Sequence, residues 1–385
     1  MKSSILCVCA ALAALPLAAH HELRAEFDEQ KPVSLRGIVT RFDWNNPHAF
    51  LYVDVKDPSG EIVNWAVEWA SPLDLRRTGW TRDALKVGDS VTVEAWLARD
   101  GSKLASGRTV VLASGKRLLE APDTGAAAET EAVRTRGQAK PTPRWPDGHP
   151  RLGVVPGEKG YWASPSASSL VETTAGNIRI DHDGLLANLD DAGKVAPFQP
   201  WAKGLYEYRQ RTLLKDDPML SCLPPGGPRM FQVAHGVQFL EQPERRRIFA
   251  LSGGGNRNWR LINLDGRALP QSEDVTPTYF GYSSGHWDGD TLVVESDAFV
   301  ERFWFSNGGL PHTEALRLTE KFSRPDFNTL RYEVLVNDPG TYTRPWSSAW
   351  PLRWVADQDI QEYFCQDNSK DEPHMVGPGA APERR

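Results

Sequence analysis

Few cysteines, no second long apolar run and no excess of basic residues mark this chain, and each absence excludes a class of protein. After Ala19 no apolar stretch is long enough for a membrane helix, so we expect no membrane span. The 44 Lys and Arg residues are outnumbered by 50 Asp and Glu residues. Nucleic acid is therefore not an expected partner, because binding phosphates requires a clustered basic face.

Familiar catalytic motifs are also missing. The chain has no phosphate-binding glycine loop, no dinucleotide fingerprint and no helical HExxH motif. The glycines at 253–255 lie between predicted strands, where a hairpin explains them. Ser283-Ser284-Gly285-His286 lacks the strand–helix context of a nucleophile elbow.

The first residues predict export. Met1-Lys2 gives a positive start, residues 5–17 form an apolar run, and Ala18-Ala19 are small enough for cleavage. This order is typical of a secretory signal peptide, here residues 1–19, and predicts a periplasmic or secreted protein that begins near His20. Cys7 and Cys9 leave with the peptide. The remaining Cys222 and Cys365 are expected to form a disulfide in an oxidising compartment, with two separate buried thiols as the alternative.

Residues 20–118 predict an OB-fold, a small barrel of five strands. Short strand patterns occupy 34–42, 49–56, 61–69, 90–98 and 108–113. Between the third and fourth, Ser71 and Pro72 are typical of the cap and first turn of a short helix. Five strands with a helix at that place describe this fold.

Three segments of this region carry a resemblance. They are His20-His21-Glu22-Leu23-Arg24, Trp44-Asn45-Asn46-Pro47-His48 and Gly79-Trp80-Thr81-Arg82. The region resembles an uncharacterised exported bacterial family, the domain of unknown function 6152. The resemblance implies an OB-fold and an exported protein, and it implies no chemistry.

Residues 119–165 are predicted to form a linker and an irregular segment, since 121–140 has almost no bulky apolar residues.

Residues 166–372 predict an antiparallel β-barrel, lipocalin-like in outline, with an open sandwich as the alternative. A helix from Pro200 to about Leu214 precedes its strands, which are expected at 231–239, 247–251, 258–264, 280–287, 291–296, 315–323, 329–337 and 360–364. Residues 373–385 are expected to form a disordered tail. Segments such as Gly285-His286-Trp287-Asp288-Gly289-Asp290 resemble a second group of uncharacterised exported bacterial proteins.

Three function hypotheses follow, and the leading one is small-molecule binding. The aromatic residues Trp259, Trp287, Trp304 and Tyr282 would line a cavity for a small apolar or aromatic molecule if the barrel is hollow. Alternatively, such aromatic side chains fill the barrel.

A second hypothesis is a cofactor-independent lyase or isomerase. Strand alternation turns Glu320 into the barrel, where His286 and His312 would complete a proton-transfer site, with Tyr282 and Ser284 on the same face as His286. The alternative is a structural ion pair of Glu320 with Arg317 or Arg331.

The third hypothesis is a copper site. If His20 begins the mature chain, its amine and ring can chelate a metal, and His21 or His48 adds an imidazole. Copper(II) suits such nitrogen ligands, whereas a hydrogen-bonding role at the barrel edge is the alternative.

Overall fold

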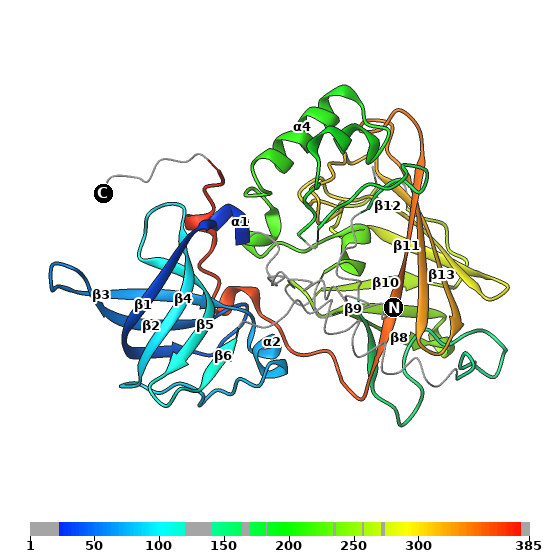
Figure 1. Ribbon diagram of the computed structural model, residues 1–385. Helices are drawn as coiled ribbons and strands as arrows, with labels where there is room; N and C mark the ends of the chain where they lie inside the picture. The colour runs from blue at the N-terminus through cyan, green and yellow to red at the C-terminus, as the bar shows by residue number, and fades with distance from the viewer. Residues whose placement is uncertain are drawn as a thin grey trace, which may run out of the picture.

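The computed structural model describes residues 23–119, 140–163, 170–181, 183–233, 236–255, 258–270 and 274–378. These residues form two β-domains that lie side by side, joined near the end of the chain by a segment that passes from the larger domain onto the smaller (Figure 1). The predicted signal peptide, His20 and His21, and residues 120–139 of the predicted linker lie outside the described residues.

The smaller domain has OB-fold topology, as the sequence predicted. Its strands are β1 (Phe27–Asp43), β2 (Ala49–Lys56), β3 (Ile62–Trp69), β4 (Ser90–Ala98), β5 (Leu104–Leu112) and β6 (Arg117–Leu119), with helices α1 (Leu23–Glu26) and α2 (Pro72–Arg77). The order is β3-β2-β1-β4-β5-β6, and a parallel pairing of β3 with β5 closes the small barrel. Ser71 caps α2 by accepting a hydrogen bond from the Asp74 amide.

The larger domain is a closed barrel of nine strands. They are β7 (Gly160–Ala163), β8 (Val237–Gln242), β9 (Arg247–Ser252), β10 (Trp259–Asn263), β11 (Tyr282–Asp288), β12 (Thr291–Asp297), β13 (Arg317–Asp326), β14 (Thr329–Asn337) and β15 (Trp346–Ala356). Neighbours in the barrel are neighbours in sequence, and β15 returns to β7. Every pairing is antiparallel except that of β10 with β11, which is parallel. Helix α4 (Pro200–Arg211) lies where the sequence predicted it.

Four details of the predicted barrel are wrong. The strand expected from residue 231 begins only at Val237, because Phe231 ends a 3-10 helix. Strand β7 lies in the segment predicted to be irregular, and β15, which contains Pro351, was not predicted. Residues 360–364 form no strand. The barrel therefore begins earlier in the chain than residue 166, and its last strand ends at Ala356.

Side chains fill the barrel interior. The short 3-10 helix η3 (Gly227–Phe231) is buried, and its last ring packs against Phe239, Phe322 and Tyr332 at centroid distances of 6.3, 5.3 and 4.8 Å. The Trp350 indole donates a hydrogen bond to the carbonyl of Phe231. This interior is a packed aromatic core, which corresponds to the alternative role considered for the aromatic residues.

A disulfide between Cys222 and Cys365 confirms the predicted pairing, with a Cα–Cα distance of 5.6 Å.

Beyond β15, residues 357–378 form a C-terminal strap that crosses onto the OB-fold domain, where the red end of the chain lies in Figure 1. The predicted disordered tail is wrong for residues 373–378. His374 pairs with Asp100 at 2.6 Å, and the Gly377 amide donates to the Ala25 carbonyl at 2.9 Å.

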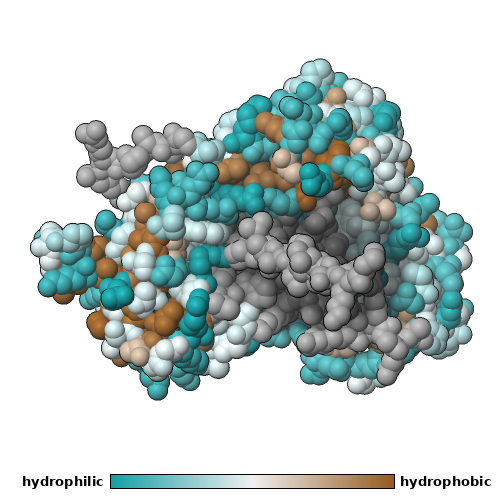
Figure 2. Space-filling model, in the orientation of Figure 1, coloured by the Kyte–Doolittle hydropathy of each residue, from teal (hydrophilic) through white to brown (hydrophobic). Residues whose placement is uncertain are grey.

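The visible face of the molecule is mostly hydrophilic, with apolar residues scattered over both domains (Figure 2). In the part of the chain that the structure describes, no helix has the length and apolar character needed to cross a bilayer.

Candidate metal centre

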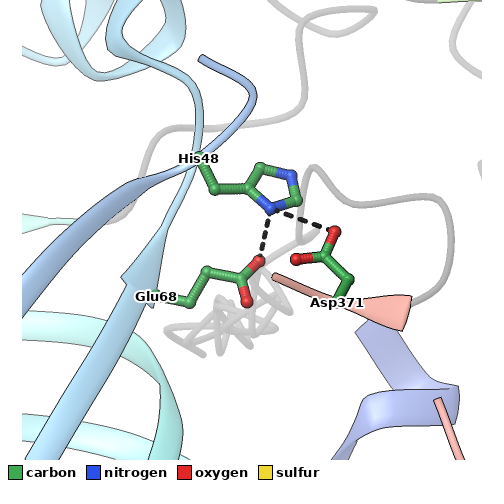
Figure 3. A group of neighbouring side chains, drawn as sticks. All are labelled: His48, Glu68 and Asp371. Atoms are coloured by element: carbon green, nitrogen blue, oxygen red, sulfur yellow. Dashed lines mark ion pairs between the residues drawn. The ribbon is translucent and has the colours of Figure 1, made fainter. Parts of the chain in front are cut away.

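Three side chains from distant parts of the sequence meet where the C-terminal strap crosses the OB-fold domain. His48 directly precedes β2, Glu68 lies near the end of the adjacent β3, and Asp371 lies in the strap (Figure 3). The Nδ1 atom of His48 is 2.7 Å from Glu68 Oε1 and 3.4 Å from Asp371 Oδ2. One potential ligand atom of each residue lies within 4.8 Å of the other two. We call these three residues, with the nearby Glu26, the junction cluster.

The strap is fixed on both sides of Asp371. The Asn368 side chain donates a hydrogen bond to the His48 carbonyl at 2.8 Å. The Lys370 ammonium lies 4.2 Å from the centre of the Phe50 ring and donates to the Tyr52 hydroxyl. These contacts place Asp371 against the outer face of β2, where Phe50 pairs directly with Glu68 of β3.

Two carboxylate oxygens of the junction cluster are buried without a hydrogen-bond partner among the described residues. They are Oε2 of Glu68 and Oε1 of Glu26, on residues that are 2% and 3% exposed. Burying a carboxylate oxygen without a partner costs free energy, so native proteins rarely leave one in this state. Both oxygens are therefore available to a further ligand.

The electrostatics reflect this crowding of carboxylates. Burial raises the pKa of Glu26 well above its usual value, and the negative charges of Glu68 and Asp371 raise it further. Burial alone would lower the pKa of His48, but the same two carboxylates outweigh that effect and raise it well above its usual value. Without another cation, a protonated His48 is the positive charge that holds Glu68 and Asp371 together.

The junction cluster offers one imidazole nitrogen and several carboxylate oxygens. Zinc binds both kinds of ligand in proteins, and three protein ligands with one open position are typical of catalytic zinc sites. Copper(I) prefers thiolate and thioether ligands, which are absent from the cluster. The arrangement fits a divalent first-row cation.

Sequence reasoning found one member of this cluster. His48 was expected to bind a metal together with His20 and His21, which lie outside the described residues. Glu26, Glu68 and Asp371 were missed. A glutamate among the apolar residues of 62–69 was the one local signal, because such a strand buries at least one face.

The three proposed catalytic residues are not brought together. Glu320 faces the barrel interior as expected, but its carboxylate pairs with Arg260 and accepts a hydrogen bond from Tyr332 at 2.7 Å. His312 is buried, with its ring nitrogens 3.0 and 3.1 Å from the carbonyls of Phe303 and Thr313. Burial lowers the pKa of His312 to about 4. His286 lies on the exposed face of β11.

The expected faces of β11 are reversed. Ser283 and Gly285 point inward, whereas Tyr282, Ser284 and His286 point outward, because the register differs by one residue from the prediction. Glu320 forms a structural ion pair, as the alternative hypothesis expected, but its partner is Arg260 and not Arg317 or Arg331. Arg317 and Arg331 are 66% exposed and pair with Asp297 and Glu333. Arg260 lies inside the barrel, where Ser283 and Ser296 also accept from its guanidinium.

The proposed ligand-binding residues do not share one interior cavity. Trp259 is 56% exposed, and Trp304 is buried under the Arg209 guanidinium. The Tyr282 hydroxyl donates to the Thr276 carbonyl. Trp287 is half-buried and stacks on His149 with ring centroids 5.0 Å apart.

Topology and site together define a two-domain β-protein whose OB-fold domain carries a histidine–carboxylate cluster. Residues 7–107 match the model of a family of unknown function, DUF6152. The match includes His48 and Glu68 and ends well before Asp371. No curated protein and no solved structure gives a match.

Proposed function

We propose that this protein is exported and binds a divalent metal ion, Zn²⁺ in the first instance, at the junction cluster. The observation that carries the proposal is the convergence of His48, Glu68 and Asp371 at one buried place, where one oxygen each of Glu68 and Glu26 has no hydrogen-bond partner among the described residues. His48, Glu68 and Asp371 are the proposed ligands, and Glu26 is the adjacent carboxylate that balances the charge of the ion.

The donor set supports this choice of metal. A mixed nitrogen and oxygen set suits Zn²⁺, whereas Ca²⁺ and Mg²⁺ prefer oxygen alone. The cysteines of the described chain are joined to each other and give no thiolate. The disulfide also supports a periplasmic or secreted location, because such bonds persist in oxidising compartments.

The test is metal binding by the full-length mature protein, freed of metal with a chelator and titrated with Zn²⁺ in a calorimeter. Glu68→Gln and Asp371→Asn keep the side-chain shape and remove the charge, so each is expected to weaken Zn²⁺ binding by about tenfold or more. Glu372→Gln is the matched control, because Glu372 is the exposed neighbour of Asp371 and bonds to Ser221. No Zn²⁺ binding by the wild-type protein, or equal losses in D371N and E372Q, would contradict the proposal.

A copper site made by His20, His21 and His48 is the second candidate, because His48 belongs to both ligand sets. The same titration with Cu²⁺ separates the two. A copper site predicts that replacing His20 and His21 together with alanine abolishes Cu²⁺ binding, while Asp371→Asn leaves it unchanged. If Zn²⁺ binds at the junction cluster, Asp371→Asn weakens Zn²⁺ binding, whereas replacing His20 and His21 leaves it unchanged.

A further inference from the structure

A second site lies at the end of the larger barrel, far in sequence from the junction cluster. Strands β8, β10 and β11 run in the same direction, because β9 is antiparallel to both β8 and β10, and β10 is parallel to β11. Their ends therefore meet at one rim of the barrel. A pocket of about 190 Å³ opens there, between this rim and the loop of residues 145–149.

The loop that forms one wall is firmly held. Its backbone closes a tight turn, with hydrogen bonds of 2.9 Å from the Trp145 amide to the His149 carbonyl and from the Gly148 amide to the Trp145 carbonyl. Arg144, just before it, pairs with Asp290 in the turn after β11. The wall is thus fixed before any ligand arrives, which lowers the entropic cost of binding.

The indoles of Trp145 and Trp287 line this pocket, and other side chains hold each of them in place. The Trp145 indole donates to Glu241 Oε1 at 3.0 Å, and the other oxygen of Glu241 accepts from the Gly153 amide at 2.7 Å. Trp287 is held by stacking on His149. Ile248 and Leu264 add apolar surface to the lining. Flat aromatic walls with an apolar base favour a planar ring.

Cationic groups stand at the same pocket. Arg246 and Arg247 both line it. Arg247 donates to Gln242 at 2.7 Å, whereas within the described residues no hydrogen bond or ion pair engages the exposed Arg246 guanidinium. The two carboxylates of the lining accept hydrogen bonds, Asp147 from the His149 amide and Glu241 from Trp145 and Gly153. Among the charged side chains of the lining, the Arg246 guanidinium is the one without a partner within the described residues, and a guanidinium suits a carboxylate.

We propose that this pocket binds a small aromatic carboxylate, with its ring between Trp145 and Trp287 and its charge on Arg246. The volume agrees with a single ring, because a protein cavity of about 150 Å³ holds benzene. This site is separate from the junction cluster, and its occupation does not require a metal.

The experiment uses benzoate as the probe and the full-length protein in the presence of a chelator. Titration is followed by calorimetry and by quenching of tryptophan fluorescence. Arg246→Ala is expected to weaken benzoate binding by about tenfold or more. Arg245→Ala is the matched control, because this neighbouring arginine does not line the pocket and its removal changes the net charge equally.

Trp287→Ala is expected to abolish binding, whereas Trp259→Ala, which removes an exposed tryptophan elsewhere on the barrel, leaves it unchanged. Two further probes separate ring from charge. Cyclohexanecarboxylate and benzyl alcohol are both expected to bind more weakly than benzoate. Absence of benzoate binding, equal losses in R245A and R246A, or benzyl alcohol binding as well as benzoate would each overturn the proposal.

Discussion

His48 lies between the carboxylates of Glu68 and Asp371, where the C-terminal strap meets the OB-fold domain. Its raised pKa means that protonation stabilises the folded state in the absence of metal. This contribution is complete below the ordinary value of 6.5 and is lost as the pH rises through the raised value. Glu26 acts in the same direction, since its raised pKa also makes ionisation at higher pH unfavourable in the folded state.

We therefore predict that the metal-free protein loses stability as the pH rises above about 6.5. Urea unfolding in the presence of a chelator, measured in steps between pH 6 and 9, checks this. The His48→Gln variant is expected to show a shallower decline over the same range. An equal slope in the two proteins would show that His48 does not cause it.

A second residue-scale prediction concerns the ion pair inside the barrel. Glu320→Gln keeps the shape of the side chain but leaves the buried Arg260 guanidinium without its counter-charge. The expected loss is about 3–5 kcal/mol of the free energy of unfolding, measured by calorimetry or denaturant. Glu333→Gln on the next strand is the control, since its exposed pair with Arg331 at 4.0 Å contributes little. An unchanged melting temperature in E320Q would mean that the pair is not structural.

Single residues were predicted well where their surroundings are local. The alternation of residues 315–323 placed Glu320 correctly, and the two cysteines of the mature chain left one pairing. Asp371 has no such local signal, because it reaches His48 only through the fold of the whole strap. Arg260 was missed for a related reason, because its partner Glu320 lies on a distant strand of the barrel. Alternation along a strand predicts which side chains face the interior, but it does not predict which of them meet across the barrel.

At the scale of elements, β15 is a strand that was not predicted, although it alternates along its length and contains a proline. Its burial alternates regularly, with Trp346, Ser348 and Trp350 inside. Pro351 is tolerated because β7 pairs only with residues from Arg353 onward, so no strand lies beside Pro351 on that side. In the OB-fold domain β2, β3 and β4 were predicted nearly to their ends, whereas the first part of β1, which contains Pro32, the first half of β5 and all of β6 were missed.

The strap is the element whose anchoring can be tested directly. Cys365 fixes it shortly before Asp371, and the bridge closes a loop across a sequence separation of 143. Replacing both cysteines with serine is expected to lower stability by about 5 kcal/mol on chain-entropy grounds. It is also expected to weaken Zn²⁺ binding, because Asp371 is then held less firmly, and calorimetric titration of the double variant measures this. Unchanged Zn²⁺ affinity would show that the contacts of Asn368 and Lys370 suffice.

For the whole molecule, a metal bound at the junction cluster would tie the strap to the OB-fold domain, since Asp371 lies in the strap and His48 and Glu68 lie in that domain. Zn²⁺ present at about one hundred times its dissociation constant is expected to add about 2.7 kcal/mol to the free energy of unfolding. It should also protect residues 357–378 from limited proteolysis, detected by mass spectrometry of the fragments. In Asp371→Asn both effects should disappear. Protection that persists in that variant would place the metal elsewhere.

The position of Asp371 near the end of the chain also sets an order of events during synthesis. His48 and Glu68 lie in the first domain of the chain, whereas Asp371 follows β15 and Cys365. Every described strand of both domains is therefore translated before the third proposed ligand. A chain truncated before residue 371 would supply His48 and Glu68 but lack the third proposed ligand, so the proposed metal site is complete only when the strap is present.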